Sequence, residues 1–110
     1  MNFLVTTTYK DSMWSQPPEK IQELAAAAIA FADKYHKAGK FKNSYSFANG
    51  KIISVWDVAS VEEMFMILAM DHPYVGRHVV DYEVDTVLDH DTIARLAAET
   101  KAAGVNIFKK

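Results

Sequence analysis

The chain contains no cysteine and few of the residues that interrupt regular structure. Its 110 residues include no Cys, four Gly and three Pro. Without Cys, the chain has no disulfide, no thiol nucleophile and no thiolate metal site. The few glycines do not form a phosphate-binding loop or a dinucleotide-binding motif, and no serine-nucleophile motif is present. These absences exclude several large enzyme classes.

A basic excess and a long apolar run are also missing. Twelve basic residues stand against fourteen acidic ones, a net charge of −2, without a basic stripe. Nucleic acid is therefore a poor candidate partner. No apolar run approaches the roughly 20 residues of a membrane span, and residues 1–8 are typical of a strand rather than of a signal peptide. We expect a soluble, cytoplasmic protein with no membrane partner.

The middle of the chain has the pattern of a β-hairpin. Residues 42–48 place Tyr and Phe on one parity and Ser on the other, as in a half-buried strand. Residues 51–58 form a second run, which is rich in β-branched and aromatic side chains. Between the runs, Asn49-Gly50 predicts a type I′ turn, in which both central residues have positive φ.

A capped helix follows the hairpin. Ser60 and Glu63 have the spacing of a capping box. The helix is predicted to end near Met70, because Asp71-His72-Pro73 cannot continue it. Its residues are apolar nearly all round, so we expect it to contribute both to the core and to a subunit contact.

The flanks supply the remaining elements. We expect strands over 2–9 and 78–87, loops over 10–16 and 74–77, and a helix that starts at Pro17-Pro18 and ends at Gly39. Alanines on the inner face of that helix predict close packing on a sheet. A third helix is expected over 89–103, with Asp89 or Asp91 as its N-cap, followed by a short tail that carries Phe108.

The order β-α-β-β-α-β-α predicts an α+β, ferredoxin-like split βαβ fold with an antiparallel four-stranded sheet and an extra C-terminal helix. We expect one domain over 1–110, with a core over 1–88 and the added helix and tail over 89–110. Two helices cover only one sheet face, and a monomer rarely leaves such an apolar face open. We therefore expect two copies to pack their sheets together as a dimeric α+β barrel, a homodimer or a larger ring of dimers.

Several short segments carry a resemblance to a known family. They are Phe3-Leu4-Val5, Gly39-Lys40-Phe41, Ser54-Val55-Trp56-Asp57-Val58, Ser60 with Glu62-Glu63-Met64, and Asp81-Tyr82-Glu83-Val84. In this order, over residues 1–88, the chain resembles the muconolactone isomerase family. The resemblance implies dimeric barrels and cofactor-free proton transfer in an unsaturated lactone from aromatic catabolism. Ser46 stands where that family often has arginine. Asp71-His72-Pro73 also resembles, more weakly, a segment of the YciI-like barrel proteins.

The last predicted strand supplies candidate proton-transfer groups. Val80, Tyr82 and Val84 alternate with acidic residues, so Asp81 and Glu83 are expected to point into the barrel lumen. A carboxylate in such an enclosure has a raised pKa, which suits a base that moves a proton next to a carbonyl. The alternative is that both acids pair with Lys or Arg, or lie in solvent.

Other candidates lie on the hairpin and at its start. Ser54 and Trp56 lie on one parity of their strand, and Ile53 and Val55 lie on the other. If Ile53 and Val55 pack under the helices, Trp56 and Ser54 line the lumen of the barrel. The Trp56 indole then either stacks on a flat ligand or fills the core of the dimer. Tyr45 is a candidate oxyanion donor, although a structural role suits it better. Lys40 either attracts a carboxylate substrate or neutralises a helix C-terminus.

His72 is the remaining candidate. With Asp71 beside it, His72 is suited to proton transfer if its loop folds over the lumen, and otherwise it is an exposed loop histidine. The four histidines show no i, i+4 spacing, so no metal site is predicted from local sequence. We expect no cofactor.

Three functions remain open from the sequence. The first is a cofactor-independent isomerase of a small lactone or enolisable acid, with Glu83 or Asp81 as the base. The second is a non-catalytic small-molecule binder or structural oligomer, which the missing arginine favours. The third is a cofactor-free oxygenase, because this fold hosts several. An enclosed pocket that contains the acidic residues would favour the isomerase. A lumen filled with side chains would favour the structural oligomer, and an apolar pocket large enough for a flat ring would favour the oxygenase.

Overall fold

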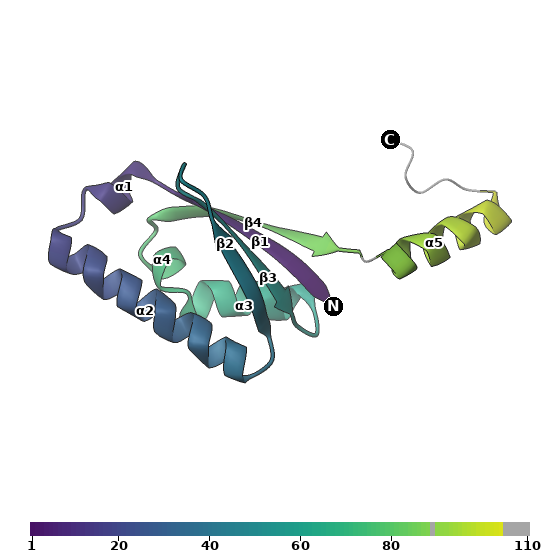
Figure 1. The fold of residues 1–110 in the computed structure, drawn as a ribbon, viewed down its shortest axis with the longest axis horizontal. Coiled ribbons are helices and arrows are strands. Elements are labelled where there is room, and N and C mark those ends of the chain that lie inside the picture. The colour runs from purple at the N-terminus through teal and green to yellow at the C-terminus, as the bar shows by residue number, and fades with distance from the viewer. Residues whose placement is uncertain (89, 105–110) are drawn as a thin grey trace.

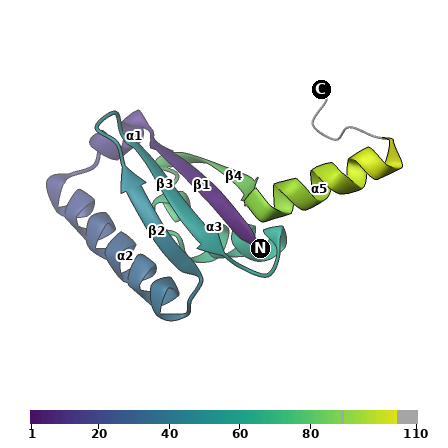
Figure 2. The same ribbon diagram turned by 45° about the vertical axis from the view of Figure 1, so that its right-hand side comes forward.

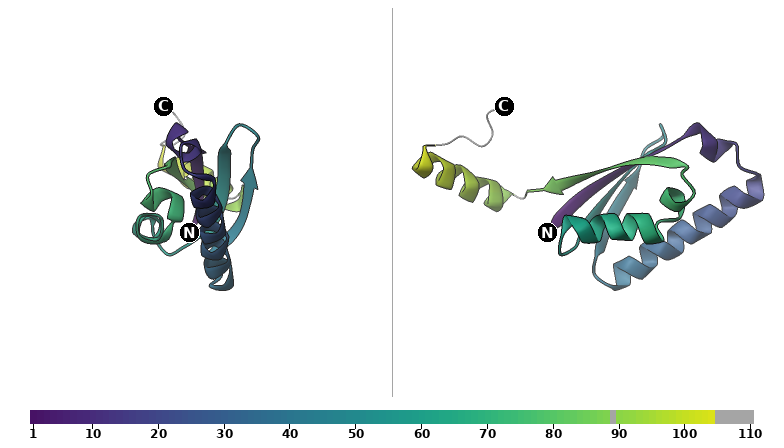
Figure 3. Two further views of the ribbon diagram at one scale, coloured as in Figure 1. Left: turned by 90° about the vertical axis from the view of Figure 1, so that its left-hand side faces the viewer. Right: turned by 180° about the vertical axis from the view of Figure 1, so that it is seen from behind.

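A computed structural model describes residues 1–88 and 90–104 of the chain. The predictions made for Asp89 and Phe108 lie outside the described residues. Four strands form one antiparallel sheet in the order β2-β3-β1-β4, with β1 at Asn2–Tyr9, β2 at Phe41–Ser46, β3 at Lys51–Asp57 and β4 at Val80–Val87. Helices α2 (Pro18–Lys37) and α3 (Val61–Asp71) cover one face of the sheet, and the other face is open (Figures 1 and 3). The fold is α+β and ferredoxin-like, as predicted.

The register of the sheet decides which side chains face the helices. Phe3 pairs with Trp56, and Val5 pairs with Ser54 on one side and Val84 on the other. Phe3, Val5 and Trp56 are buried, and they pack with Met64 and further side chains of α3 in the main core. The intervening residues of each strand therefore belong to the open face.

The first long helix has the ends that its sequence predicts. Pro18 opens α2, and Gly39, with a φ of 76°, follows its last turn. The backbone N–H groups of Gly39 and Lys40 donate to the carbonyls of His36 and Tyr35. This is the Schellman arrangement, which satisfies carbonyls that the helix leaves free.

The turn of the hairpin differs from the prediction. Gly50 has a φ of 86°, whereas Asn49 is not among the residues with positive φ. The Gly50 N–H donates to the Phe47 carbonyl, and the Phe47 N–H donates to the Lys51 carbonyl. The loop thus contains three residues and ends on a glycine bulge, so only Gly50 needs the left-handed conformation and the type I′ prediction is wrong.

The Ser60 half of the capping box of α3 is confirmed, whereas the return bond of Glu63 goes to the residue before Ser60. The Glu63 N–H donates to the Ser60 hydroxyl oxygen at 3.1 Å, and the Glu63 carboxylate accepts the Ala59 N–H at 2.8 Å. Because Pro73 follows, α3 ends at Asp71. Its inner face is buried, whereas Phe65, Met66 and Met70 are exposed.

Two short helices were predicted as loops. They are α1 (Asp11–Trp14) and α4 (Pro73–Gly76). The last strand begins at Val80 rather than His78, because His78 adopts a φ of 57°, which no regular strand accommodates. Helix α5 (His90–Ala103) projects away from the sheet beyond the end of β4 (Figures 1 and 2).

Candidate functional site

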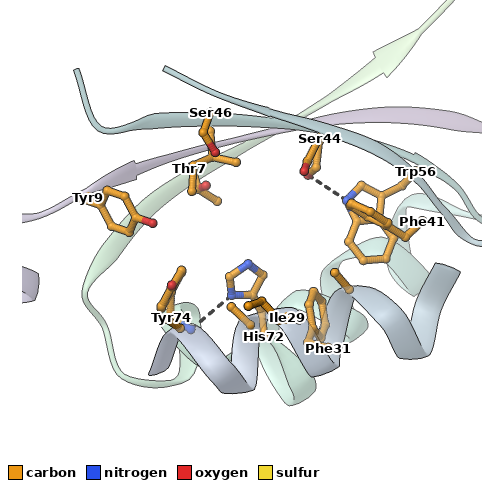
Figure 4. A pocket seen from close by; sticks show the side chains of 15 residues that line it. Thr7, Tyr9, Ile29, Phe31, Phe41, Ser44, Ser46, Trp56, His72 and Tyr74 are labelled. Carbon is orange, nitrogen blue, oxygen red and sulfur yellow. Dashed lines mark hydrogen bonds between the residues drawn. The ribbon is translucent and has the colours of Figure 1, made fainter. Parts of the chain in front are cut away.

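A cavity of about 310 Å³ lies between the helix-facing side of the sheet and α2 (Figure 4). Pockets for small ligands begin at about this size. Its wall combines small, aromatic and hydroxyl-bearing side chains, namely Thr7, Tyr9, Ala25, Ala28, Ile29, Phe31, Ala32, Phe41, Ser44, Ser46, Ile52, Ser54, Trp56, His72 and Tyr74.

The inner alanines of α2 create this space. Ala25, Ala28 and Ala32 line the cavity, while Leu24 and Phe31 of the same helix are buried on either side. We predicted that the alanines bring the helix close to the sheet. The structure shows the reverse, because the bulky neighbours hold the helix off and the short side chains leave a void.

His72 is the central polar group of the cavity. It lies between α3 and α4, and its Nδ1 accepts the backbone N–H of Tyr74 at 3.2 Å, which caps α4. Since Nδ1 accepts, the neutral ring carries its proton on Nε2. Figure 4 shows the other ring nitrogen directed into the cavity. Burial lowers the pKa of His72 to about 4, so the ring is neutral at pH 7.

Two tyrosines lie beside His72. The rings of Tyr9 and Tyr74 meet edge to face at a centroid distance of 5.6 Å. Burial, with a smaller effect of the Tyr9 hydroxyl, raises the pKa of Tyr74 to about 12. Tyr74 is therefore a neutral hydroxyl at physiological pH.

Hydroxyl groups of the sheet lie across the cavity from His72. Thr7, Ser44 and Ser46 point toward it in Figure 4. Thr7 is only 5% exposed, and its hydroxyl has no hydrogen-bond partner within the described residues. No fully buried side-chain oxygen of the described residues lacks a partner, so the Thr7 hydroxyl is open to the cavity, where a ligand or water can supply a bond.

Trp56 and Ser54 lie on the opposite side of the sheet from their predicted place. Ile53 and Val55 are on the open face, so the condition for a lumen wall is not met. Trp56 is 1% exposed, contacts Phe31 at a centroid distance of 5.6 Å, and donates from Nε1 to the Ser54 hydroxyl at 2.9 Å. Both residues line the cavity under α2 instead.

The acidic residues of β4 do not reach this cavity. Val80, Tyr82 and Val84 face the helices as predicted, so Asp81 and Glu83 project from the open face, where both are exposed. Asp81 forms an ion pair with Lys10 at 3.6 Å. The sheet therefore separates Asp81 and Glu83 from His72.

Tyr45 and Lys40 are also distant from His72. Tyr45 stands on the open face opposite Ile53, and its hydroxyl accepts a hydrogen bond from the Asn43 amide at 2.9 Å. Lys40 forms an ion pair with the capping residue Glu63. That lysine, followed by the Ala59 N–H, lowers the pKa of the Glu63 carboxyl.

Asp71 faces away from His72. Its carboxylate accepts hydrogen bonds from Lys34 Nζ at 2.8 Å and from the Tyr35 hydroxyl, both on α2. These two donors, Lys34 first, lower the pKa of Asp71. The predicted His72–Asp71 proton pair is therefore not formed in this chain, and Asp71 instead links the end of α3 to α2.

The described residues contain no cluster of three or more His, Asp or Glu side chains arranged to hold a metal ion. Over the same residues, no helix is long and apolar enough to cross a membrane.

Sequence reasoning found His72 but missed the groups around it. Thr7 and Tyr9 share the parity of Phe3 and Val5 on β1, so the alternation of that strand already placed them under the helices. Tyr74 follows Pro73 directly, and the proline is the signal for the turn that buries it. No sequence signal placed these groups at a void rather than in packed core.

Comparisons with known proteins bear on the fold. No family model matches the chain, and no curated protein matches it in sequence. Among solved structures, the chain is similar to 5-chloro-2-hydroxyhydroquinone dehydrochlorinase from Burkholderia phenoliruptrix in complex with 2,5-dihydroxybenzoquinone. The match has a TM-score of 0.65 at 13% identity and covers 83% of this chain and 97% of the other. This likeness shows the fold, and the resemblance to muconolactone isomerase stays a prediction.

Proposed function

We propose that the chain binds a small ring compound in the cavity under α2 and converts it by proton transfer, without a bound cofactor. The observation that carries the proposal is His72. Its backbone bond fixes the ring orientation and leaves the Nε2–H directed into the cavity. A positioned group of this kind is the usual element of proton-transfer catalysis.

A neutral imidazole suits one role in particular. When a proton leaves a carbon next to a carbonyl, negative charge develops on the carbonyl oxygen. A fixed N–H donor stabilises that charge most strongly in a site with little water, and a neutral histidine polarises a carbonyl in this way in triosephosphate isomerase. In the present chain, the His72 Nε2–H would donate to that oxygen, a water molecule at the mouth of the cavity would accept the proton from carbon, and the resulting hydronium or another water would return a proton to the ring.

The aromatic end of the cavity would hold the ring of the ligand. Phe31, Phe41 and Trp56 form this end (Figure 4), and aromatic side chains pack well against flat rings. The similar dehydrochlorinase was solved with 2,5-dihydroxybenzoquinone, a flat ring with several oxygens. That ligand supports the proposed class of compound.

A second candidate uses the open face. Leu4, Ile53 and Val55 form a half-buried apolar strip there, beside the acids of β4. A second copy that packs its own open face on this strip would form a homodimer and enclose Asp81 and Glu83. In that case Glu83 would be the base of the predicted lactone isomerase, and the proton transfer would occur between the sheets.

One experiment separates the two candidates. In D2O, deuterium incorporation into cyclic ketones and unsaturated lactones is followed by NMR for the wild type, His72→Asn and Glu83→Gln. Asn retains an oxygen that caps α4 but lacks the Nε2–H. We expect His72→Asn to slow exchange at least about a hundredfold, as for the loss of an oxyanion donor, and Glu83→Gln to leave it unchanged.

The opposite pattern would move the reaction to the open face and refute the His72 proposal. Probes that bind to the wild type without any exchange would identify a non-catalytic binder. In that case the proposed conversion is refuted and only binding remains.

A further inference from the structure

The described residues that line the cavity include no Asp, Glu, Lys or Arg. His72 is neutral because Nδ1 accepts a backbone N–H and burial disfavours the protonated ring. Tyr74 retains its proton for the same physical reason. An ionised ligand entering this space would lose part of its water without gaining a counter-charge.

The carboxylate that precedes His72 in the chain is directed elsewhere. The carboxylate of Asp71 and the ammonium of Lys34 are bonded to each other. Neither residue lines the cavity. Since an unpaired ion is costly to bury, the site discriminates by charge before it discriminates by shape.

Five of the polar groups that remain lie on two opposing walls. Thr7, Ser44 and Ser46 come from the sheet, and His72 and Tyr74 come from the start of α4 (Figure 4). All five are neutral hydrogen-bonding groups, and hydroxyls both donate and accept. A ring with oxygens on opposite edges would reach both walls at once.

We propose that the cavity accepts uncharged rings that carry hydroxyl or carbonyl oxygens on opposite edges, and that it rejects the same rings when they carry an ionised carboxylate. This inference rests on the proposed function, because it assumes that the cavity is the ligand site. It narrows the predicted substrates to lactones and neutral hydroxylated or keto rings, and it removes the enolisable acids.

A matched pair of probes tests the inference. At pH 7, 2,5-dihydroxybenzamide is uncharged, whereas 2,5-dihydroxybenzoate has almost the same shape and one negative charge. Both are titrated into the full chain by calorimetry and by amide NMR. We expect the amide to bind at least about tenfold more tightly, because the anion loses hydration without compensation.

A gain of function gives the converse test. Ser46 lies at the rim of the cavity on the edge strand β2, so an arginine there can reach inward while its aliphatic part stays at the surface. Ser46→Arg should raise the affinity for the benzoate, relative to that for the amide, at least about tenfold. An unchanged ratio of the two affinities in this variant would overturn the charge argument.

Two threonine variants locate the binding. Thr7→Val removes the buried hydroxyl without removing a protein hydrogen bond, so it should weaken amide binding several-fold without loss of stability. Thr6→Val changes the adjacent residue on the open face and should leave amide binding unchanged. If both probes bind equally and Thr7→Val weakens both, the charge inference is wrong and the site stands. If neither probe binds, or Thr7→Val has no effect, the proposed site itself is refuted.

Discussion

Acidification should destabilise the protein through His72, in a pH range where carboxylates contribute little. The pKa of this side chain is about 4 in the fold against 6.5 in the unfolded chain, because burial disfavours the protonated ring. Between these values the unfolded chain binds more protons, so the free energy of unfolding falls as the pH decreases. The loss begins near pH 6.5 and is complete near pH 4.

The size of the effect follows from the same values. One pKa unit corresponds to about 1.4 kcal/mol, so the full difference corresponds to about 3 kcal/mol. From pH 7 to pH 5 the linkage relation gives about 2 kcal/mol, taken as an upper value because water at the cavity mouth screens part of the cost. Asp71 and Glu63 also have lowered pKa values, so they too make the free energy of unfolding fall on acidification, but at lower pH. Their stabilising contributions are lost only as the pH falls below their unfolded pKa values, toward the folded ones.

Urea unfolding at pH 7 and pH 5 measures the difference. From pH 7 to pH 5, the free energy of unfolding of His72→Asn should fall by about 2 kcal/mol less than that of the wild type. The three exposed histidines are present in both proteins, so the difference reports on His72. Proton NMR of the His72 ring should give a midpoint near pH 4. A midpoint near 6.5, or equal losses in the two proteins, would refute the argument that burial controls this residue.

Three further predictions concern the frame around the site. Ser60→Ala should lower the free energy of unfolding by about 1 kcal/mol, because α3 loses its N-cap bond, and urea unfolding measures the loss. Gly50→Ala should cost about 1–2 kcal/mol, because alanine disfavours a φ of 86° even though its Cβ has room at 3.5 Å from the Tyr9 ring. A Gly50→Ala variant that shows no measurable loss of stability in thermal unfolding would contradict this prediction. Ile53→Lys should convert the proposed homodimer to a monomer on light-scattering chromatography, because a charge would enter the apolar strip of the open face. A wild type that is already monomeric at high concentration would refute the dimer.

Much of the fold was predictable from local signals. Strand β1 has the predicted bounds, and the Ser60 cap and the Gly39 stop act where the sequence places them. Each of these features depends on backbone chemistry within a few residues. Local rules therefore suffice for the order of the strands and the three longer helices and for the ferredoxin-like topology.

The inner face of β3 was not predictable in the same way. Ile52 and Trp56 lie on one parity and Ile53 and Val55 on the other, so both faces are apolar and the alternation does not choose between them. Pairing of Trp56 with Phe3 and Phe41 decides the question. These are long-range contacts that the strand alone does not reveal.

The cavity was beyond sequence reasoning for a related reason. Small residues such as Ala28 permit either close packing or a void. Which of the two forms depends on whether Phe31 and Leu24 hold α2 away from the sheet, and that is a property of the assembled layers. His72 was identified from its chemistry, but its burial depends on the same spacing.

The imidazole of His72 has two hydrogen-bonding roles, on opposite edges of one rigid ring. One nitrogen must accept from the main chain to start α4, while the other must donate toward the empty space. Asparagine and glutamine carry both kinds of group at a single end, and the acidic side chains lack a donor when ionised. Attempts to redesign this protein for new ligands should therefore vary the hydroxyl wall of the sheet and leave position 72 unchanged. No other natural side chain can both accept the main-chain N–H and donate into the cavity from opposite edges of one ring.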